Sequence, residues 1–108
     1  MTRSVTPVEL YAELEHGHVP MILDVRNQDE FGVWQVEGSK PVPTRNVPIW
    51  VAIEQVPELA EEVPNDSVVI CAHGNGSAML IDMLADHGVS VRNLEGGTQA
   101  WAELLVPR

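Results

Sequence analysis

The chain has a single cysteine, Cys71, among its 108 residues. An internal disulfide needs two cysteines, so folding is not expected to depend on an oxidising compartment. No stretch approaches the roughly 20 apolar residues of a membrane-spanning helix, and the N-terminus lacks the apolar run of a secretory signal. We therefore expect a cytoplasmic protein that folds as one domain over residues 1–108.

Basic side chains are also few. Six Lys and Arg residues stand against sixteen Asp and Glu residues, which gives a formal net charge of −10. Nucleic acids and anionic membranes are bound through Lys and Arg contacts, so neither is expected as a partner. The acid excess favours solubility, and it disfavours the attraction of anionic substrates from a distance.

Several common functional motifs are missing. The chain has no Gly-Lys-Ser/Thr phosphate loop, no Gly-x-Gly-x-x-Gly after the first strand and no Gly-x-Ser-x-Gly. The histidines show no zinc-type spacing with each other or with Cys71; they are His16, His18, His73 and His87. No metal or other cofactor is therefore expected.

Short apolar runs predict the strands of a sheet. The runs at 20–25, 68–71 and 89–94 are typical of buried parallel strands. Residues 44–47 lie among prolines and predict a brief strand at an edge of the sheet.

Segments with helical spacing separate these runs. Helices are predicted after caps at Thr6, Asn27 and Thr98, over the proline-interrupted segment 49–60, and over 77–87. Strands that alternate with helices predict an α/β fold, in which a parallel sheet is covered on both faces.

Cys71 stands where a buried strand gives way to a loop that enters a helix near Ser77. Backbone N–H groups converge at such a place, with the positive end of the helix dipole behind them, and they favour a thiolate. Gly74 and Gly76 allow the loop to curl closely around a ligand. The alternative is that Cys71 is a small apolar core residue with no chemistry of its own.

Asp24 interrupts the apolar run at 20–25. A carboxylate inside a strand needs a partner, and Arg26 lies on the same face two residues later. We interpret the two as a buried pair that braces the loop after the strand rather than as catalytic residues.

Four ordered blocks, spread over nearly the whole chain, resemble the single-domain rhodaneses, a family of sulfurtransferases. Each block alone is weak, but their order and spacing together are specific. The blocks are Leu23-Asp24-Val25-Arg26 with Glu30-Phe31, Val36-Glu37-Gly38 with Asn46-Val47-Pro48, Cys71-Ala72-His73-Gly74-Asn75-Gly76-Ser77-Ala78, and Leu94-Glu95-Gly96-Gly97-Thr98-Gln99-Ala100-Trp101.

The resemblance implies a rhodanese-like three-layer fold with about five parallel strands. It also implies that Cys71 takes a sulfane sulfur, forms a persulfide and passes the sulfur to cyanide or another thiol. Asp24 and Arg26 would then support the site from behind. The residues expected to surround the terminal sulfur with N–H groups are Ala72, His73, Gly74, Asn75, Gly76 and Ser77.

The chain departs from the family pattern in ways that bear on the donor. Gly76 stands where active members often carry arginine, Ala72 where a basic residue is frequent, and Gln35 where histidine is common. Without the loop arginine we expect weak activity with thiosulfate, and a low-molecular-weight or protein persulfide as donor. His73 and Arg45 are the candidates to supply positive charge near the loop.

Two other functions are considered. Cysteine phosphatases and arsenate reductases share this fold, but they need arginine six positions after the cysteine, where this chain has Ser77. A noncatalytic rhodanese-like module for binding or regulation stays open as the alternative to a sulfurtransferase, because the loop arginine is absent.

Overall fold

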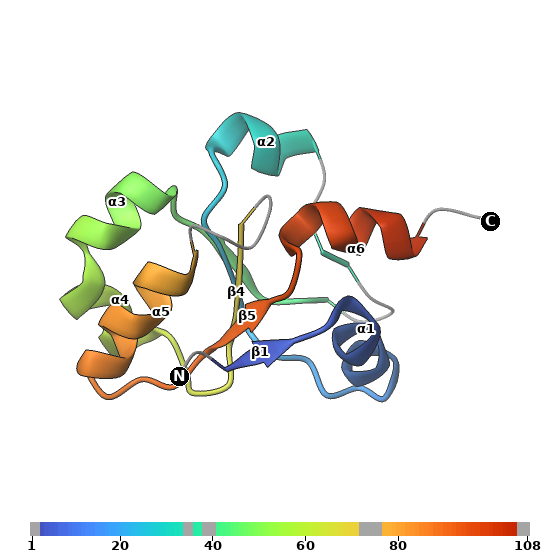
Figure 1. Cartoon of the computed structure of the whole chain (residues 1–108), viewed down its shortest axis with the longest axis horizontal. Helices are drawn as coiled ribbons and strands as arrows, with labels where there is room; N and C mark the ends of the chain where they lie inside the picture. Colours follow the sequence, from blue (N-terminus) through green and yellow to red (C-terminus); the bar gives the residue numbers. More distant parts are fainter. Residues whose placement is uncertain (1–2, 34–35, 38–40, 72–76, 106–108) are drawn as a thin grey trace.

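A computed structural model describes residues 3–33, 36–37, 41–71 and 77–105. Its centre is a five-stranded sheet in which every neighbouring pair is parallel (Figure 1). The strands, in spatial order, are β1 (Ser4–Val5), β5 (Arg92–Leu94), β4 (Val68–Ile70), β2 (Ile22–Asp24) and β3 (Thr44–Asn46). The expected α/β class and five-stranded parallel sheet are confirmed.

Helices cover both faces of the sheet. One face packs against α1 (Pro7–Glu15) and α6 (Gly97–Leu105), and the other against α3 (Ile49–Glu54), α4 (Val56–Glu62) and α5 (Ser77–Asp86). The short helix α2 (Gln28–Val33) lies beyond the carboxyl end of β2 (Figure 1). None of the helices in the described segments is both long and apolar enough to cross a bilayer.

In the central strands β2 and β4, apolar residues follow one another because successive side chains enter different cores. Ile22 and Val68 pack with Trp101 in the core under α1 and α6. Leu23 and Val69 pack in the core under α3, α4 and α5. Alternate residues of a strand point to opposite faces, so a central strand covered on both sides buries apolar residues at successive positions.

The first helix starts as its sequence predicts. Thr6 N–H donates to Glu9 Oε1 at 2.9 Å, and Glu9 N–H donates to Thr6 Oγ1 at 3.1 Å, which completes a capping box. The backbone hydrogen bond from Thr6 and then its side-chain hydrogen bond hold the pKa of Glu9 below its ordinary value. Leu10 and Leu14, expected on one face, are both buried.

Some boundaries differ from the predictions. The segment 49–60 forms two helices that meet at Gln55, because Pro57 fits the first turn of a new helix, where no N–H is needed, but not the interior of a long one. The last strand begins only at Arg92. Thr98, predicted as a cap, lies inside α6, and its N–H donates to the backbone oxygen of Cys71 at 2.8 Å.

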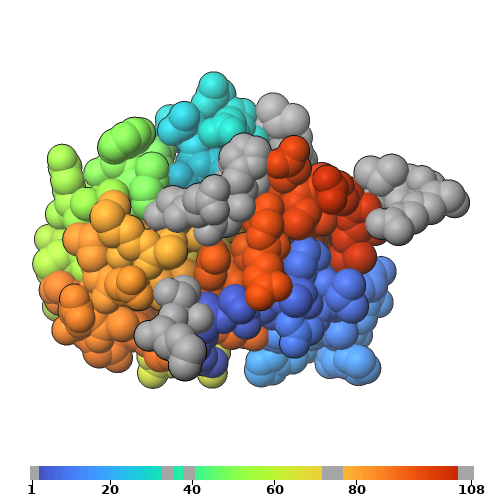
Figure 2. Space-filling model, viewed as in Figure 1, coloured from blue at the N-terminus to red at the C-terminus, as the bar shows by residue number. Residues whose placement is uncertain are grey.

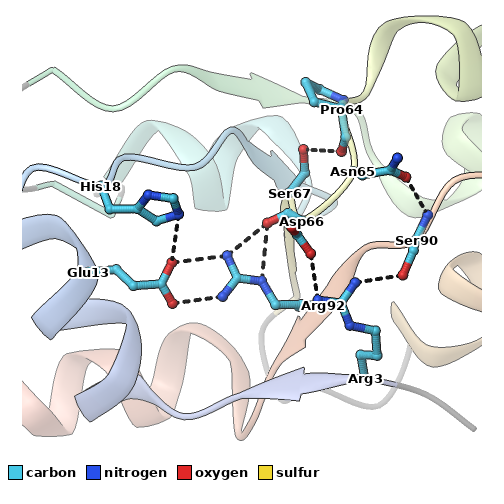
Figure 3. A network of polar contacts seen from close by, with 9 residues as sticks. All are labelled: Arg3, Glu13, His18, Pro64, Asn65, Asp66, Ser67, Ser90 and Arg92. Carbon is cyan, nitrogen blue, oxygen red and sulfur yellow. Dashed lines mark hydrogen bonds and ion pairs between the residues drawn. The ribbon is translucent and has the colours of Figure 1, made fainter.

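Polar side chains form a connected network at the amino ends of the strands (Figure 3). The Arg92 guanidinium donates to both carboxylate oxygens of Glu13, at 2.7 and 3.1 Å, and to the backbone oxygen of Asp66. Arg3 donates to Asp66 Oδ1 at 2.5 Å and to Ser90 Oγ at 2.6 Å. The network joins β1, α1, β5 and the turn before β4 at the edge opposite Cys71.

Asp66 occupies an unusual backbone conformation in this network. Its φ of 68° is in the left-handed region, which Asp and Asn tolerate better than most residues. The hydrogen bond and the positive charge of Arg3 hold the pKa of the Asp66 carboxyl below its usual range. The turn that leads into β4 is therefore stabilised by an ionised carboxylate.

Candidate functional site

Cys71 directly follows the buried strand β4, at the carboxyl edge of the sheet. It is partly buried and lines a cavity of about 190 Å³. The other lining residues come from the segment that follows β2, from α2 and from the start of α3; they are Val25, Arg26, Asn27, Glu30, Ile49 and Trp50. The thiol is thus neither sealed in the interior nor fully exposed.

The helices around this end of the sheet form one side of the molecule. In Figure 2, the green segment of α3 lies beside the cyan segment of α2 and beside the orange segment of α5. The carboxyl ends of parallel strands are the usual place for a ligand site in an α/β fold, because chain segments diverge there. The position of Cys71 agrees with that rule.

A hydroxyl group lies close to the sulfur. Ser77 is the first residue of α5 and is fully buried, and its Oγ is 3.7 Å from Cys71 Sγ. The Ser77 hydroxyl donates a short hydrogen bond to Oδ1 of Asn93 in β5. Of the loop residues expected at the site, Ser77 is therefore placed beside the cysteine.

Asn93 is a site residue that the sequence did not indicate. It lies 22 positions after Cys71, in the apolar run 89–94 that predicted only a buried strand. The pairing of Val69 with Asn93 in the parallel register of β4 and β5 brings it to the site. That adjacency depends on the spatial order of the strands, which local periodicity does not contain.

Asp24 and Arg26 form the predicted buried pair. Their side chains are only 1% and 3% exposed. Arg26 Nε donates to Asp24 Oδ1 at 3.0 Å and Oδ2 at 3.1 Å, and the NH2 group donates to Oδ2 at 2.8 Å. Arg26 N–H adds a bond to Oδ1 at 3.0 Å. The carboxylate is satisfied by one residue, which compensates for its burial.

This pair holds the segment beside the cavity in place. Asn46 Nδ2 donates to the backbone oxygens of Asp24 and Arg26, at 3.0 and 2.8 Å. The Arg26 NH1 group donates to the backbone oxygen of Glu30 at 3.3 Å, which ties the segment to α2. Arg26 lines the same cavity as Cys71, so the brace is adjacent to the sulfur.

The predicted loop lies outside the described residues. This applies to Ala72, His73, Gly74, Asn75 and Gly76, whose N–H groups were expected to surround a terminal sulfur. The ring of amide donors stays a prediction. Gln35, at the position of a frequent family histidine, also lies outside the described residues.

Arg45 does not line the cavity. Its guanidinium pairs with the carboxylate of Glu62 at the end of α4. The expectation that Arg45 supplies charge near the loop stays a prediction, because residues 72–76 lie outside the described part of the chain. Among the residues that the structure describes, no three His, Cys, Asp or Glu side chains come together as metal ligands.

Comparison with known proteins agrees with the fold. The family model for the rhodanese-like domain matches residues 6–104. The chain belongs to the rhodanese-like domain family. A similar solved structure is a rhodanese-related protein from Thermoplasma volcanium, with a TM-score of 0.74 and 29% identity over 97% of this chain and 95% of that one.

Its curated relatives include sulfurtransferases. The chain is 26% identical to the thiosulfate sulfurtransferase GlpE of Pseudomonas aeruginosa, over 90% of this chain and 81% of GlpE. It is 29% identical to the adenylyltransferase and sulfurtransferase UBA4 of Yarrowia lipolytica over 92% of this chain. That match spans only 23% of UBA4, so the chain corresponds to one part of such a protein.

Proposed function

We propose that this protein is a sulfurtransferase that carries sulfane sulfur as a persulfide on Cys71. The observation that carries the proposal is the placement of Cys71: it lies at the carboxyl edge of the sheet, lines an open cavity, and has the Ser77 hydroxyl 3.7 Å from its sulfur. The sulfurtransferases among its relatives support the same chemistry.

The proposed reaction is a double displacement. The Cys71 thiolate attacks the outer sulfur of a donor persulfide, the donor S–S bond breaks, and the donor leaves as a thiolate. An acceptor thiolate or cyanide then attacks the outer sulfur on Cys71. The bond between the Cys71 sulfur and the outer sulfur breaks, and its electron pair returns to Cys71. No external oxidant or reductant is therefore needed.

The electrostatics favour a persulfide over thiosulfate as donor. Arg26 is the only basic residue that lines the cavity among those described, and its charge is balanced by Asp24. Gly76 replaces the loop arginine that would hold a sulfonate group. We therefore expect slow turnover with thiosulfate.

Intact-mass titration tests the proposal. Incubation with glutathione persulfide is expected to add about 32 Da, the mass of one sulfur atom, and Cys71→Ser is expected to remove the addition. Because Cys71 is the only cysteine, any adduct on a thiol must be on this residue. Added cyanide is then expected to return the protein to its original mass and release thiocyanate.

A control separates the folded site from ordinary thiol reactivity. The same protein in urea keeps Cys71 but loses the cavity, so its rate of adduct formation gives the rate of an unassisted thiol. The native protein is expected to react faster. Absence of an adduct with every donor, or equal rates in the two states, contradicts the proposal and favours a noncatalytic binding module.

A further inference from the structure

Trp50 is exposed at the same cavity that contains the thiol. It is the second residue of α3 and is 74% exposed, the most exposed of the large apolar side chains described. A single exposed apolar residue is common and needs no explanation. This one, however, lines the cavity with Ile49 and Cys71, where an incoming group must pass.

Among the described residues, the charges at this cavity favour a cation. The Arg26 guanidinium is bonded to Asp24, so its charge is compensated. Glu30 is exposed, lines the cavity, and follows the exposed Asp29 in the first turn of α2. A Lys or Arg side chain is attracted to these carboxylates and is favourably placed over the face of an indole ring.

The cavity is of a size to admit one side chain of a partner rather than a whole small molecule. Its volume of about 190 Å³ is below the roughly 300–1,000 Å³ typical of pockets that enclose a whole small molecule. A cysteine side chain fits inside it while the rest of a polypeptide segment lies outside, over Trp50. Trp is among the residues that contribute most to protein interfaces.

We propose that the surface formed by Trp50, Glu30 and the Cys71 cavity binds a protein segment whose exchanging cysteine has Lys or Arg neighbours. This inference rests on the proposed function. The thiolate of the segment attacks the outer sulfur of the Cys71 persulfide, the sulfur–sulfur bond to Cys71 breaks, and the segment leaves as a persulfide. Trp50 and Glu30 select the partner and take no part in the bond exchange.

Two synthetic peptides test the selection. Each has one central cysteine, flanked by lysines in one peptide and by glutamates in the other. The protein is loaded with glutathione persulfide, freed of donor and mixed with each peptide, and sulfur transfer is followed by intact mass. The lysine peptide is expected to react about tenfold faster at low salt, with the difference shrinking as salt is added. Equal rates for the two peptides overturn the proposal.

Variants locate the surface. Trp50→Ala is expected to slow transfer to the lysine peptide about fivefold, and Glu30→Gln to reduce the ratio between the two peptides. Val51→Ala is the matched control, because Val51 is 40% exposed on the same helix but does not line the cavity. An unchanged rate in Trp50→Ala, or an equal loss in Val51→Ala, also overturns the proposal.

Binding without sulfur transfer distinguishes this inference from the proposed function. A lysine peptide with serine in place of cysteine is titrated into unloaded protein by calorimetry. It is expected to bind wild-type protein about fivefold more tightly than Trp50→Ala. If no persulfide forms but this difference is found, the function fails and the docking surface stands. If persulfide forms but the difference is absent, only the docking surface fails.

Discussion

The Ser77 hydroxyl lies between the sulfur of Cys71 and the side-chain oxygen of Asn93. Ser77 Oγ donates to Asn93 Oδ1 and lies 3.7 Å from Cys71 Sγ, a contact in which either atom can be the donor. Once the sulfur is an anion, the Ser77 proton is expected to turn toward it, because an anionic acceptor forms the stronger hydrogen bond.

Ser77→Ala is therefore expected to slow persulfide formation. A hydrogen bond contributes about 0.5–1.5 kcal/mol, so removing it is expected to lower the rate by about two- to tenfold. The rate is measured by intact mass with glutathione persulfide in excess. Ser67→Ala is the matched control, because Ser67 is equally buried but donates to Pro64 at the amino end of β4. Equal effects of the two substitutions contradict a role for Ser77 at the sulfur.

The buried pair of Asp24 and Arg26 is expected to dominate the polar contribution to stability. Arg26→Leu removes the guanidinium that bonds both carboxylate oxygens and leaves a carboxylate that is 1% exposed. Breaking a buried pair in this way costs about 3–5 kcal/mol in the free energy of unfolding, measured with urea.

Glu62→Gln is the control for that substitution. It breaks the pair with Arg45, whose side chains are 43% and 47% exposed, and is expected to cost about 1 kcal/mol or less. Similar losses in the two variants contradict the view that burial makes the Asp24–Arg26 pair important.

The features predicted correctly from the sequence are those that local chemistry determines. The capping box of Thr6 and Glu9 spans three residues, and the pairing of Asp24 with Arg26 spans two. Neither depends on how distant segments meet. The position of Cys71 at the end of a strand follows from the apolar run before it.

The features that sequence reasoning missed depend on tertiary neighbours. Asn93 reaches the site only because β5 lies beside β4, and Trp50 only because α3 begins at the cavity. Thr98 has a good capping side chain, yet its N–H bonds to Cys71, and α6 begins one residue earlier at Gly97. In each case the local pattern fits more than one arrangement, and the packing of distant segments decides between them.

Restoring an arginine in the loop is expected to increase activity with thiosulfate. Gly76→Arg supplies a guanidinium that binds two oxygens of an anion at once, and turnover is expected to rise about tenfold or more. Thiocyanate formation from thiosulfate and cyanide measures it. Gly32→Arg adds the same charge on α2, where an added Cβ meets no atom within 4 Å. An equal rise in both variants means that net charge, not the loop position, limits the reaction.

Stability is expected to fall in acid partly through Asp66. Arg3 lowers the pKa of this carboxyl in the folded protein, with smaller contributions from Arg92 and His18. A lowered folded-state pKa gives stability that is present above the unfolded-state pKa, about 3.9 for aspartate, and is lost as the pH falls through the folded-state value. Asp66→Asn keeps a residue that tolerates the left-handed backbone but cannot ionise.

The urea midpoint of Asp66→Asn is therefore expected to lie below that of the wild type at pH 6. The difference between the two midpoints is expected to shrink as the pH falls below about 4. Asp86→Asn provides the control, since Asp86 is an exposed aspartate at the end of α5, away from this network. Asp86→Asn removes the same formal charge without touching Arg3, so any effect common to both variants comes from net charge alone. A constant gap between Asp66→Asn and wild type down to pH 2.5 contradicts the assignment, because the lost stability then does not depend on the charge that Arg3 binds.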